Sequence, residues 1–333
     1  MSSKSTNFEF AGERLPSPLI NGAGSVNGPN LGNLYTETRR LAASGIGAIR
    51  LGSFTINKRL GNVETYGEPV LIIDEEQGKT WNAMGLPNIG RDAAVLHAPN
   101  LKTYVHGANK PIIYSGSPAD MEGYSSVNQA LDLAESFLRT PVDLVEINVS
   151  CPNVVTEGGG RKPMMGYDLE TMEELVDGLA NRIGVGQRLG VKLPPYLTEE
   201  QVAMVPDLAK LFRTRKVFKF LVTSNTMPGE VPTYPDGTPR PLSVPGGGGG
   251  LSGPATQSVG RGQLRLWMEA IEGELDIDSS EGVDTGYELA MRREQGAKVG
   301  SGVTFLWRSQ VWGKAVDRVL TSFAEEEDIR LQN

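Results

Sequence analysis

Side chains that bind metals or form cross-links are scarce in this sequence. Cys151 is the only cysteine among 333 residues, so no disulfide can form within the chain. A cysteine-ligated iron–sulfur cluster would need more thiolates. His97 and His106 are the only histidines, which argues against a metal site built from several histidines. We therefore expect a protein from a reducing compartment without a metal centre.

Long hydrophobic runs and clusters of positive charge are also missing. No stretch approaches the roughly 18 consecutive apolar residues of a membrane-spanning helix, and residues 1–9 lack the apolar core of a signal peptide. The net charge is −8, and no basic stripe favours nucleic acid or an anionic membrane as a partner. We expect a cytoplasmic protein that binds neither nucleic acid nor membrane.

The chain does contain a regular alternation of short apolar runs and amphipathic stretches. The runs show little polar alternation, which is typical of strands covered on both faces. The predicted strands are residues 18–24, 48–54, 111–117, 143–150, 190–195, 219–225, 275–280 and 297–303. Apolar residues at a 3.6-residue period predict helices over residues 129–138, 169–183, 201–212 and 313–324.

Eight such alternations predict an α/β fold in a single domain over residues 1–333, a closed (β/α)8 TIM barrel. An open, doubly wound parallel sheet is the alternative. Residues 60–88 and 227–253 do not fit the alternation and contain many turn-forming glycines and prolines. We interpret them as long loops inserted at the C-terminal face of the strands, either functional lids or disordered segments. Barrel enzymes place their chemistry at this face.

Polar residues interrupt the ends of several predicted strands, and in a barrel these ends meet at one mouth. Asn148 and Cys151 end the fourth strand, Lys192 lies in the fifth and Asn225 ends the sixth, while Asn82 belongs to the first long loop. Amides can hold a planar polar ring, and a buried lysine is a candidate contact for an anionic or electron-rich ligand. A lone cysteine is more often a small buried apolar residue, and an asparagine near a strand end a turn former. Only their joint placement favours a site.

Glycine-rich segments suggest where a phosphate would bind. Residues 246–250 are five glycines, residues 281–286 follow the seventh strand, and residues 300–304 belong to the eighth. The loops after strands seven and eight are the usual phosphate site of this fold. A run of glycines is also typical of a flexible linker, so by itself it is weak evidence.

At these motifs the chain resembles the dihydroorotate dehydrogenases, especially the soluble class 1A enzymes, and also the catalytic domain of dihydropyrimidine dehydrogenase. The resemblance covers nearly the whole chain, and its most specific part is the Asn-x-Ser-Cys-Pro-Asn run at residues 148–153. Residues 82–88, 190–196 and 225–226 also match. This likeness implies an FMN-dependent oxidoreductase of pyrimidine biosynthesis that oxidises dihydroorotate to orotate.

The resemblance also implies a role for each matching residue. Cys151 is the base that removes a proton from ring carbon 5, while a hydride leaves ring carbon 6 for flavin N5. An ordinary thiol has a pKa of about 8.5, so a small thiolate fraction is available at neutral pH. The implied substrate contacts are Asn82, Met84, Gly85, Leu86, Asn148, Asn153, Asn225 and Thr226, with the backbone of residues 84–86 binding the substrate carboxylate. The implied cofactor contacts are Ala23, Gly24, Ser53, Asn148, Lys192, Gly250, Gly282 and Thr304.

Some positions depart from the family pattern. The lysine that class 1A enzymes carry at the end of strand two is Gly52 here. Glu281 begins the segment that usually reads Gly-Gly, and an acidic residue beside a phosphate is unfavourable by like charge. Three alternatives therefore stay open: a related flavoenzyme acting on another dihydropyrimidine or cyclic amide, a flavin-free lyase using Lys192 as a Schiff base, and a catalytically silent flavin- or metabolite-binding protein.

The partners follow from the resemblance. It implies a small dihydropyrimidine substrate, fumarate or another soluble electron acceptor, and a homodimer. A class 1B enzyme would instead need a partner subunit that carries an iron–sulfur cluster. Residues 154–167 include three successive glycines, and we expect them to close over the site as a lid.

Overall fold

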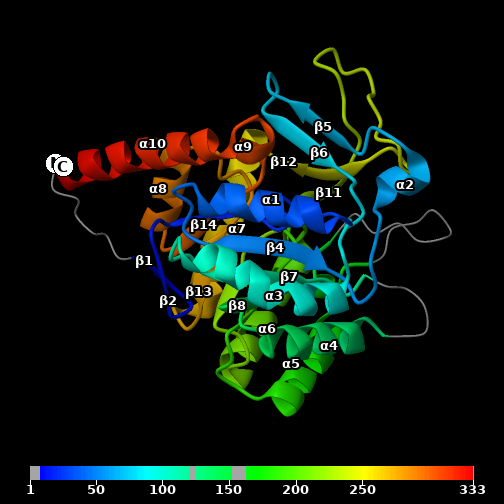
Figure 1. The fold of residues 1–333 in the computed structure, drawn as a ribbon, viewed down its shortest axis with the longest axis vertical. Helices are drawn as coiled ribbons and strands as arrows, with labels where there is room; N and C mark the ends of the chain where they lie inside the picture. The colour runs from blue at the N-terminus through cyan, green and yellow to red at the C-terminus, as the bar shows by residue number, and fades with distance from the viewer. Residues whose placement is uncertain (1–7, 120–124, 152–162, 333) are drawn as a thin grey trace.

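The computed structural model describes residues 8–119, 125–151 and 163–332, and a barrel of parallel strands forms its centre (Figure 1). The barrel strands are β3 (Leu19–Asn21), β4 (Ile49–Phe54), β7 (Ile112–Gly116), β8 (Leu144–Asn148), β9 (Leu189–Lys192), β10 (Phe220–Val222), β13 (Asp276–Ser279) and β14 (Val299–Gly302). They are hydrogen-bonded in the order β3-β14-β13-β10-β9-β8-β7-β4, and a parallel bridge between Ile20 and Ala48 joins the two ends of this order. The predicted (β/α)8 TIM barrel is confirmed, and each predicted strand overlaps one barrel strand.

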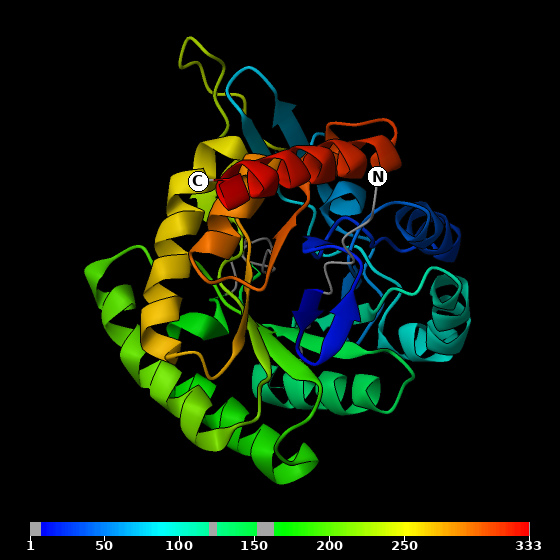
Figure 2. The ribbon, with the colours of Figure 1, turned by 90° about the vertical axis from the view of Figure 1, so that its left-hand side faces the viewer.

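Helices surround the barrel on its outside (Figure 2). They are α1 (Leu31–Ala42), α3 (Arg91–His106), α4 (Ser126–Leu138), α5 (Leu169–Ile183), α6 (Glu199–Arg215), α7 (Gln257–Ile271), α8 (Gly286–Glu294) and α10 (Trp312–Gln332). The four predicted helices lie within α4, α5, α6 and α10. Side-chain caps fix several starts, because Asp168 accepts a hydrogen bond from Thr171 N before α5 and Thr198 forms a capping box with Gln201 before α6.

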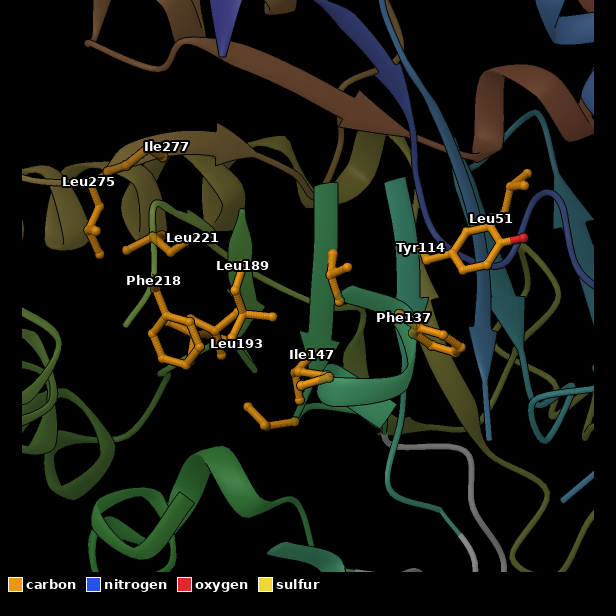
Figure 3. Close-up of a cluster of buried hydrophobic side chains, with 14 of the residues drawn as sticks. Leu51, Tyr114, Phe137, Ile147, Leu189, Leu193, Phe218, Leu221, Leu275 and Ile277 are labelled. Carbon is orange, nitrogen blue, oxygen red and sulfur yellow. The ribbon is translucent and has the colours of Figure 1, made fainter. Parts of the chain in front are cut away.

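The barrel wall separates two layers of the apolar core. Consecutive strand residues point to opposite faces, so Tyr114 packs outward with Phe137 of α4 while its neighbour Ile113 belongs to a separate cluster with Phe220. Figure 3 shows the outer layer, with side chains such as Ile147 between the strands and the helices. Because both faces of each strand are covered, the strands read as continuous apolar runs.

A hairpin that was not among the predicted elements covers the amino-terminal end of the barrel. Strands β1 (Phe8–Phe10) and β2 (Glu13–Leu15) pair antiparallel and cross the near end of the barrel in Figure 2. The Phe10 ring lies 4.9 Å from that of Phe220, and Ala11 N donates to Asp276 Oδ2 at 2.7 Å. Three-residue strands are too short to produce a strand pattern.

The two long insertions form a sheet of their own, which corrects the prediction of lids or disordered loops. Strands β5 (Leu71–Asp74), β6 (Lys79–Asn82), β11 (Met227–Glu230) and β12 (Gly249–Ser252) join antiparallel in the order β11-β12-β6-β5. The short helix α2 (Asn62–Tyr66) precedes them, and all lie toward the upper right of Figure 1. Trp81 anchors a small apolar cluster with Ile72 and Leu251. Two glycines of the five-glycine run lie in β12, so the run is not simply a linker.

Candidate active site

A cavity opens at the carboxyl ends of the barrel strands. Its interior volume is about 110 Å³, and the total rises to about 940 Å³ when the open space at its mouth is included. The predicted site residues that line it are Ala23, Gly24, Ser53, Asn82, Met84, Gly85, Leu86, Asn148, Cys151, Lys192, Asn225, Thr226, Gly282 and Thr304. Gly250 lies outside the lining, in β12 opposite Asn82. Asn153 and most of the expected lid fall outside the described residues.

Hydrogen bonds join two of the lining asparagines through Ser150. Ser150 Oγ donates to Asn148 Oδ1 at 2.7 Å, and Asn225 Nδ2 donates to Ser150 Oγ at 3.1 Å and to Ser150 O at 3.0 Å. Asn148 Nδ2 donates to Ser53 Oγ at 2.9 Å. Both amides are therefore held in fixed orientations before any ligand arrives.

The same network continues down into buried charges inside the barrel. Ser53 and Ser115 hydroxyls lie 2.8 Å apart, and Ser115 Oγ donates to Glu146 Oε1 at 2.7 Å. Arg50 is fully buried, with Nε 3.0 Å from Glu146 Oε2 and Nη2 2.5 Å from Asp278 Oδ2. Buried charges are tolerated when they are paired in this way, so the network gives the cavity a rigid polar floor.

Lys192 is a buried cation in the cavity lining. It ends β9, pairs in register with Asn148 of β8, and is 7 % exposed. Burial lowers the pKa of Lys192, and the carboxylate of Glu146 offsets part of this effect. Within the described part of the chain no ion pair or hydrogen bond engages its Nζ. A buried cation without a partner favours an electron-rich or anionic ligand.

Residues 84–86 form a turn whose carbonyl groups are occupied and whose N–H groups are not. The carbonyl of Met84 accepts from Asn62 N at 2.8 Å, and that of Gly85 accepts from Arg59 Nε at 3.2 Å. Among the described residues, the N–H groups of residues 84–86 have no hydrogen-bond acceptor. Gly85 and Leu86 both have positive φ, at 74° and 56°. Successive N–H groups in such a turn make a concave site for an anion.

Cys151 and Thr226 also line the cavity. Cys151 follows β8 directly after Ser150 and is half-buried in the cavity lining. Thr226 N donates to Asn225 Oδ1 at 2.8 Å, while the buried Thr226 Oγ1 has no hydrogen-bond partner among the described residues. A hydroxyl left without a partner on a cavity wall is suited to a polar ligand atom.

Loops after β13 and β14 form the glycine-rich end of the cavity. Gly282 has φ of 82°, and a Cβ there would lie 2.8 Å from Gln257 Cα, so only glycine fits. Ser252 Oγ and Thr304 Oγ1 lie 3.4 Å apart beside it. Glu281 also lines this end and is 7 % exposed, and burial raises its pKa to about 8. At neutral pH this carboxyl is therefore mostly neutral, which removes most of the like-charge penalty that the sequence predicted.

The backbone at Gly52 leaves no room for a side chain. Its φ is 103°, and a Cβ would lie 2.5 Å from Ser115 O and 2.7 Å from Phe54 N. A lysine at this place would therefore require the strand end to move. Its neighbour Ser53 lines the cavity instead, which brings a hydroxyl where the family pattern has a charge.

Sequence reasoning missed the residues that support the site. Ser150 stands inside the recognised motif and was assigned no role, and Arg50, Glu146 and Asp278 lie within the predicted strands. The available signal was a charged residue in an otherwise apolar strand, which indicates a buried pair across the barrel.

In the described ranges no group of three or more His, Cys, Asp or Glu side chains could hold a metal ion. None of the described helices is long and apolar enough to cross a membrane.

Several known proteins are similar to this chain in sequence. The chain is 27 % identical over 284 residues to dihydroorotate dehydrogenase A (fumarate) of Lactococcus lactis subsp. cremoris, covering 85 % of this chain and 82 % of the relative. It is 28 % identical over 251 residues to dihydroorotate dehydrogenase (fumarate) of Trypanosoma brucei brucei, covering 75 % and 71 %. It is 29 % identical over 287 residues to the catalytic subunit of dihydroorotate dehydrogenase B (NAD(+)) of Geobacter sulfurreducens, covering 85 % and 81 %.

Solved structures give the same fold. The ligand-free DHODH of Eimeria tenella matches with a TM-score of 0.75 at 16 % identity, over 97 % of this chain and 87 % of that one. The family model described as dihydroorotate dehydrogenase matches residues 5–323. The chain therefore belongs to the dihydroorotate dehydrogenase family and is a flavin-dependent oxidoreductase of that kind.

Proposed function

We propose that this protein oxidises dihydroorotate to orotate, with FMN bound in the cavity and Cys151 as the base. One observation carries the proposal: a thiol, two pre-oriented amides and an unpaired lysine line the same cavity. A planar heterocycle with alternating donors and acceptors matches the amides of Asn148 and Asn225.

The cavity residues fit an FMN cofactor. Lys192 offers a buried positive charge to a flavin ring, and the glycine-rich loops after β13 and β14 offer backbone to its phosphate. Glu281 does not oppose the phosphate at neutral pH, because burial keeps its carboxyl mostly protonated. When bound, FMN supplies the two-electron acceptor for the substrate hydride. Lys192 would then stabilise the negative charge that gathers on the reduced ring.

The substrate carboxylate would bind at the turn of residues 84–86. Its three N–H groups have no other acceptor among the described residues, and its carbonyls are turned to Asn62 and Arg59. A carboxylate accepts hydrogen bonds only, so it matches a cluster of donors. This contact would favour dihydroorotate over a dihydropyrimidine that lacks a carboxylate.

Cys151 would remove the proton from the substrate carbon as a thiolate. The thiolate is the reactive form of a cysteine, and it needs no histidine to act. The amides bind and orient the ring in front of the sulfur, so that the proton and the hydride leave from opposite faces.

The proposal also covers the electron acceptor and the oligomeric state. Relatives named for fumarate and for NAD(+) match at similar identity, 27 % and 29 %. We propose a single-chain enzyme with fumarate or another soluble small-molecule acceptor, acting as a homodimer in the cytoplasm.

The test uses the purified full-length protein under anaerobic conditions. Its cofactor is released and identified by mass, and the flavin absorbance is followed as dihydroorotate is added, with dihydrouracil as the control that lacks the carboxylate. We expect FMN, rapid bleaching by dihydroorotate, little bleaching by dihydrouracil, and recovery of absorbance on adding fumarate. Absence of flavin, or equal bleaching by both substrates, would contradict the cofactor or the substrate assignment respectively.

A further inference from the structure

Glu281 is a buried acid in the wall of the cavity, at the end of β13. Its backbone φ is 69°, in the region that favours glycine, so the chain places a carboxyl where a glycine would be easier to accommodate. Its Oε1 atom is buried and has no hydrogen-bond partner among the described residues. A carboxyl oxygen left this way on a ligand cavity is suited to the ligand itself.

Two cations and one hydroxyl face Glu281 from the elements packed around it. Lys192 on β9 and Arg292 on α8 attract its ionised form, and Thr256 before α7 offers a hydroxyl. Arg292 is already engaged, since it donates to Glu288 Oε1 at 2.6 Å, to Ser279 Oγ at 2.7 Å and to the backbone carbonyl of Glu281 at 2.9 Å.

Other charges near Glu281 are paired within the protein. Asp284, the other acid on this part of the wall, lies with Oδ2 2.9 Å from Arg308 Nη1. Below, Arg50 is held between two buried carboxylates. Glu281 is therefore the acid of this wall whose carboxyl is not tied into an ion pair, and burial raises its pKa to about 8.

We propose that Glu281 determines which flavin the cavity accepts: as a neutral acid it donates a hydrogen bond to the cofactor phosphate, and once ionised it rejects a phosphorylated flavin. This inference rests on the proposed FMN site and deepens it. The loop that Glu281 begins is one of the two that bind phosphate in this fold. A carboxyl that is protonated donates, whereas a carboxylate only accepts and repels another anion.

The expected signature is a loss of FMN affinity with rising pH. Binding of an anion favours the protonated form of Glu281, so affinity is full well below pH 8 and falls as the pH rises through about 8. One proton is linked to binding, so the dissociation constant at pH 9 should be about tenfold higher than at pH 7. Phosphate itself keeps its charge over this range, because its second pKa is about 6. Riboflavin has no phosphate and should bind with little dependence on pH.

The experiment titrates the flavin-free full-length protein with FMN and with riboflavin, following flavin fluorescence from pH 7 to pH 9.5. Glu281→Gln is the matched variant, since its amide is neutral and donates at every pH. Glu281→Gly is a second variant that the positive φ accommodates. We expect a pH-dependent FMN affinity in the parent protein only, and a flat riboflavin affinity throughout.

Two outcomes would overturn the inference while leaving the proposed function intact. One is FMN affinity that does not change with pH in the parent protein. The other is the same decline in Glu281→Gln, which would assign the titration to another group. Failure of FMN to bind at any pH would instead refute the cofactor assignment, and this inference with it.

Discussion

Removing the hydroxyl of Ser150 should weaken catalysis without unfolding the protein. Ser150→Ala deletes the 2.7 Å hydrogen bond to Asn148 Oδ1 and the 3.1 Å hydrogen bond from Asn225 Nδ2, but it keeps the two bonds made by the Ser150 backbone. Each lost bond contributes about 0.5–1.5 kcal/mol, so the variant should lose about 1–3 kcal/mol of transition-state binding. This corresponds to a decrease in kcat/KM of roughly 5- to 150-fold.

The assay is steady-state oxidation of dihydroorotate, with orotate affinity measured separately to show ground-state binding. Ser17→Ala is the control, because Ser17 is also buried and donates a single hydrogen bond, to Gly45 O at 2.8 Å, before β3 begins. That variant should lose similar stability and keep full kcat/KM. Unchanged kcat/KM in a folded Ser150→Ala protein would show that the fixed orientation of the two amides does not matter.

Three other substitutions probe separate parts of the molecule. Lys192→Met should raise the free energy of unfolding of the flavin-free protein, measured by urea unfolding, by about 1–3 kcal/mol, because it removes a buried unpaired charge. The same variant should lower the reduction potential of bound flavin, measured by redox titration. An unchanged potential would contradict contact between Lys192 and the flavin. Gly52→Ala should cost about 2–4 kcal/mol because its Cβ would meet Ser115 O at 2.5 Å, whereas Gly107→Ala, with open space around it, should be nearly neutral in thermal unfolding. Phe10→Ala should lower the free energy of unfolding by about 3–5 kcal/mol and leave kcat unchanged, because the hairpin covers the end of the barrel opposite the cavity. A fall in kcat at a temperature where the variant is folded would show that the hairpin affects the site.

The barrel could be predicted because its strands carry their own signal. Strands covered on both faces are mostly apolar, and four of the surrounding helices show a clear 3.6-residue period. The inserted sheet could not be predicted in this way. Its strand β12 consists of Gly249–Ser252, a sequence with low strand propensity, and it exists because it pairs with β6 far away in the chain. Such pairing leaves no local pattern.

The site, like the fold, could be predicted only in part. Motif likeness located the residues that line the cavity, because side chains at successive strand ends must converge in a barrel. It did not reveal which residues hold them in place. Ser150 connects two asparagines only through three-dimensional proximity, and Glu281 was judged by its formal charge. Burial, which only the fold determines, keeps that carboxyl mostly neutral by raising its pKa to about 8.

The central claim, that Cys151 is the base beside a bound flavin, is tested most directly by single-turnover reduction of the flavin in Cys151→Ser. Because a hydroxyl is a far weaker base than a thiolate at neutral pH, the rate of bleaching by dihydroorotate should fall about 100- to 10,000-fold while FMN stays bound. An unchanged bleaching rate at pH 7 in a variant that retains its FMN would contradict the assignment.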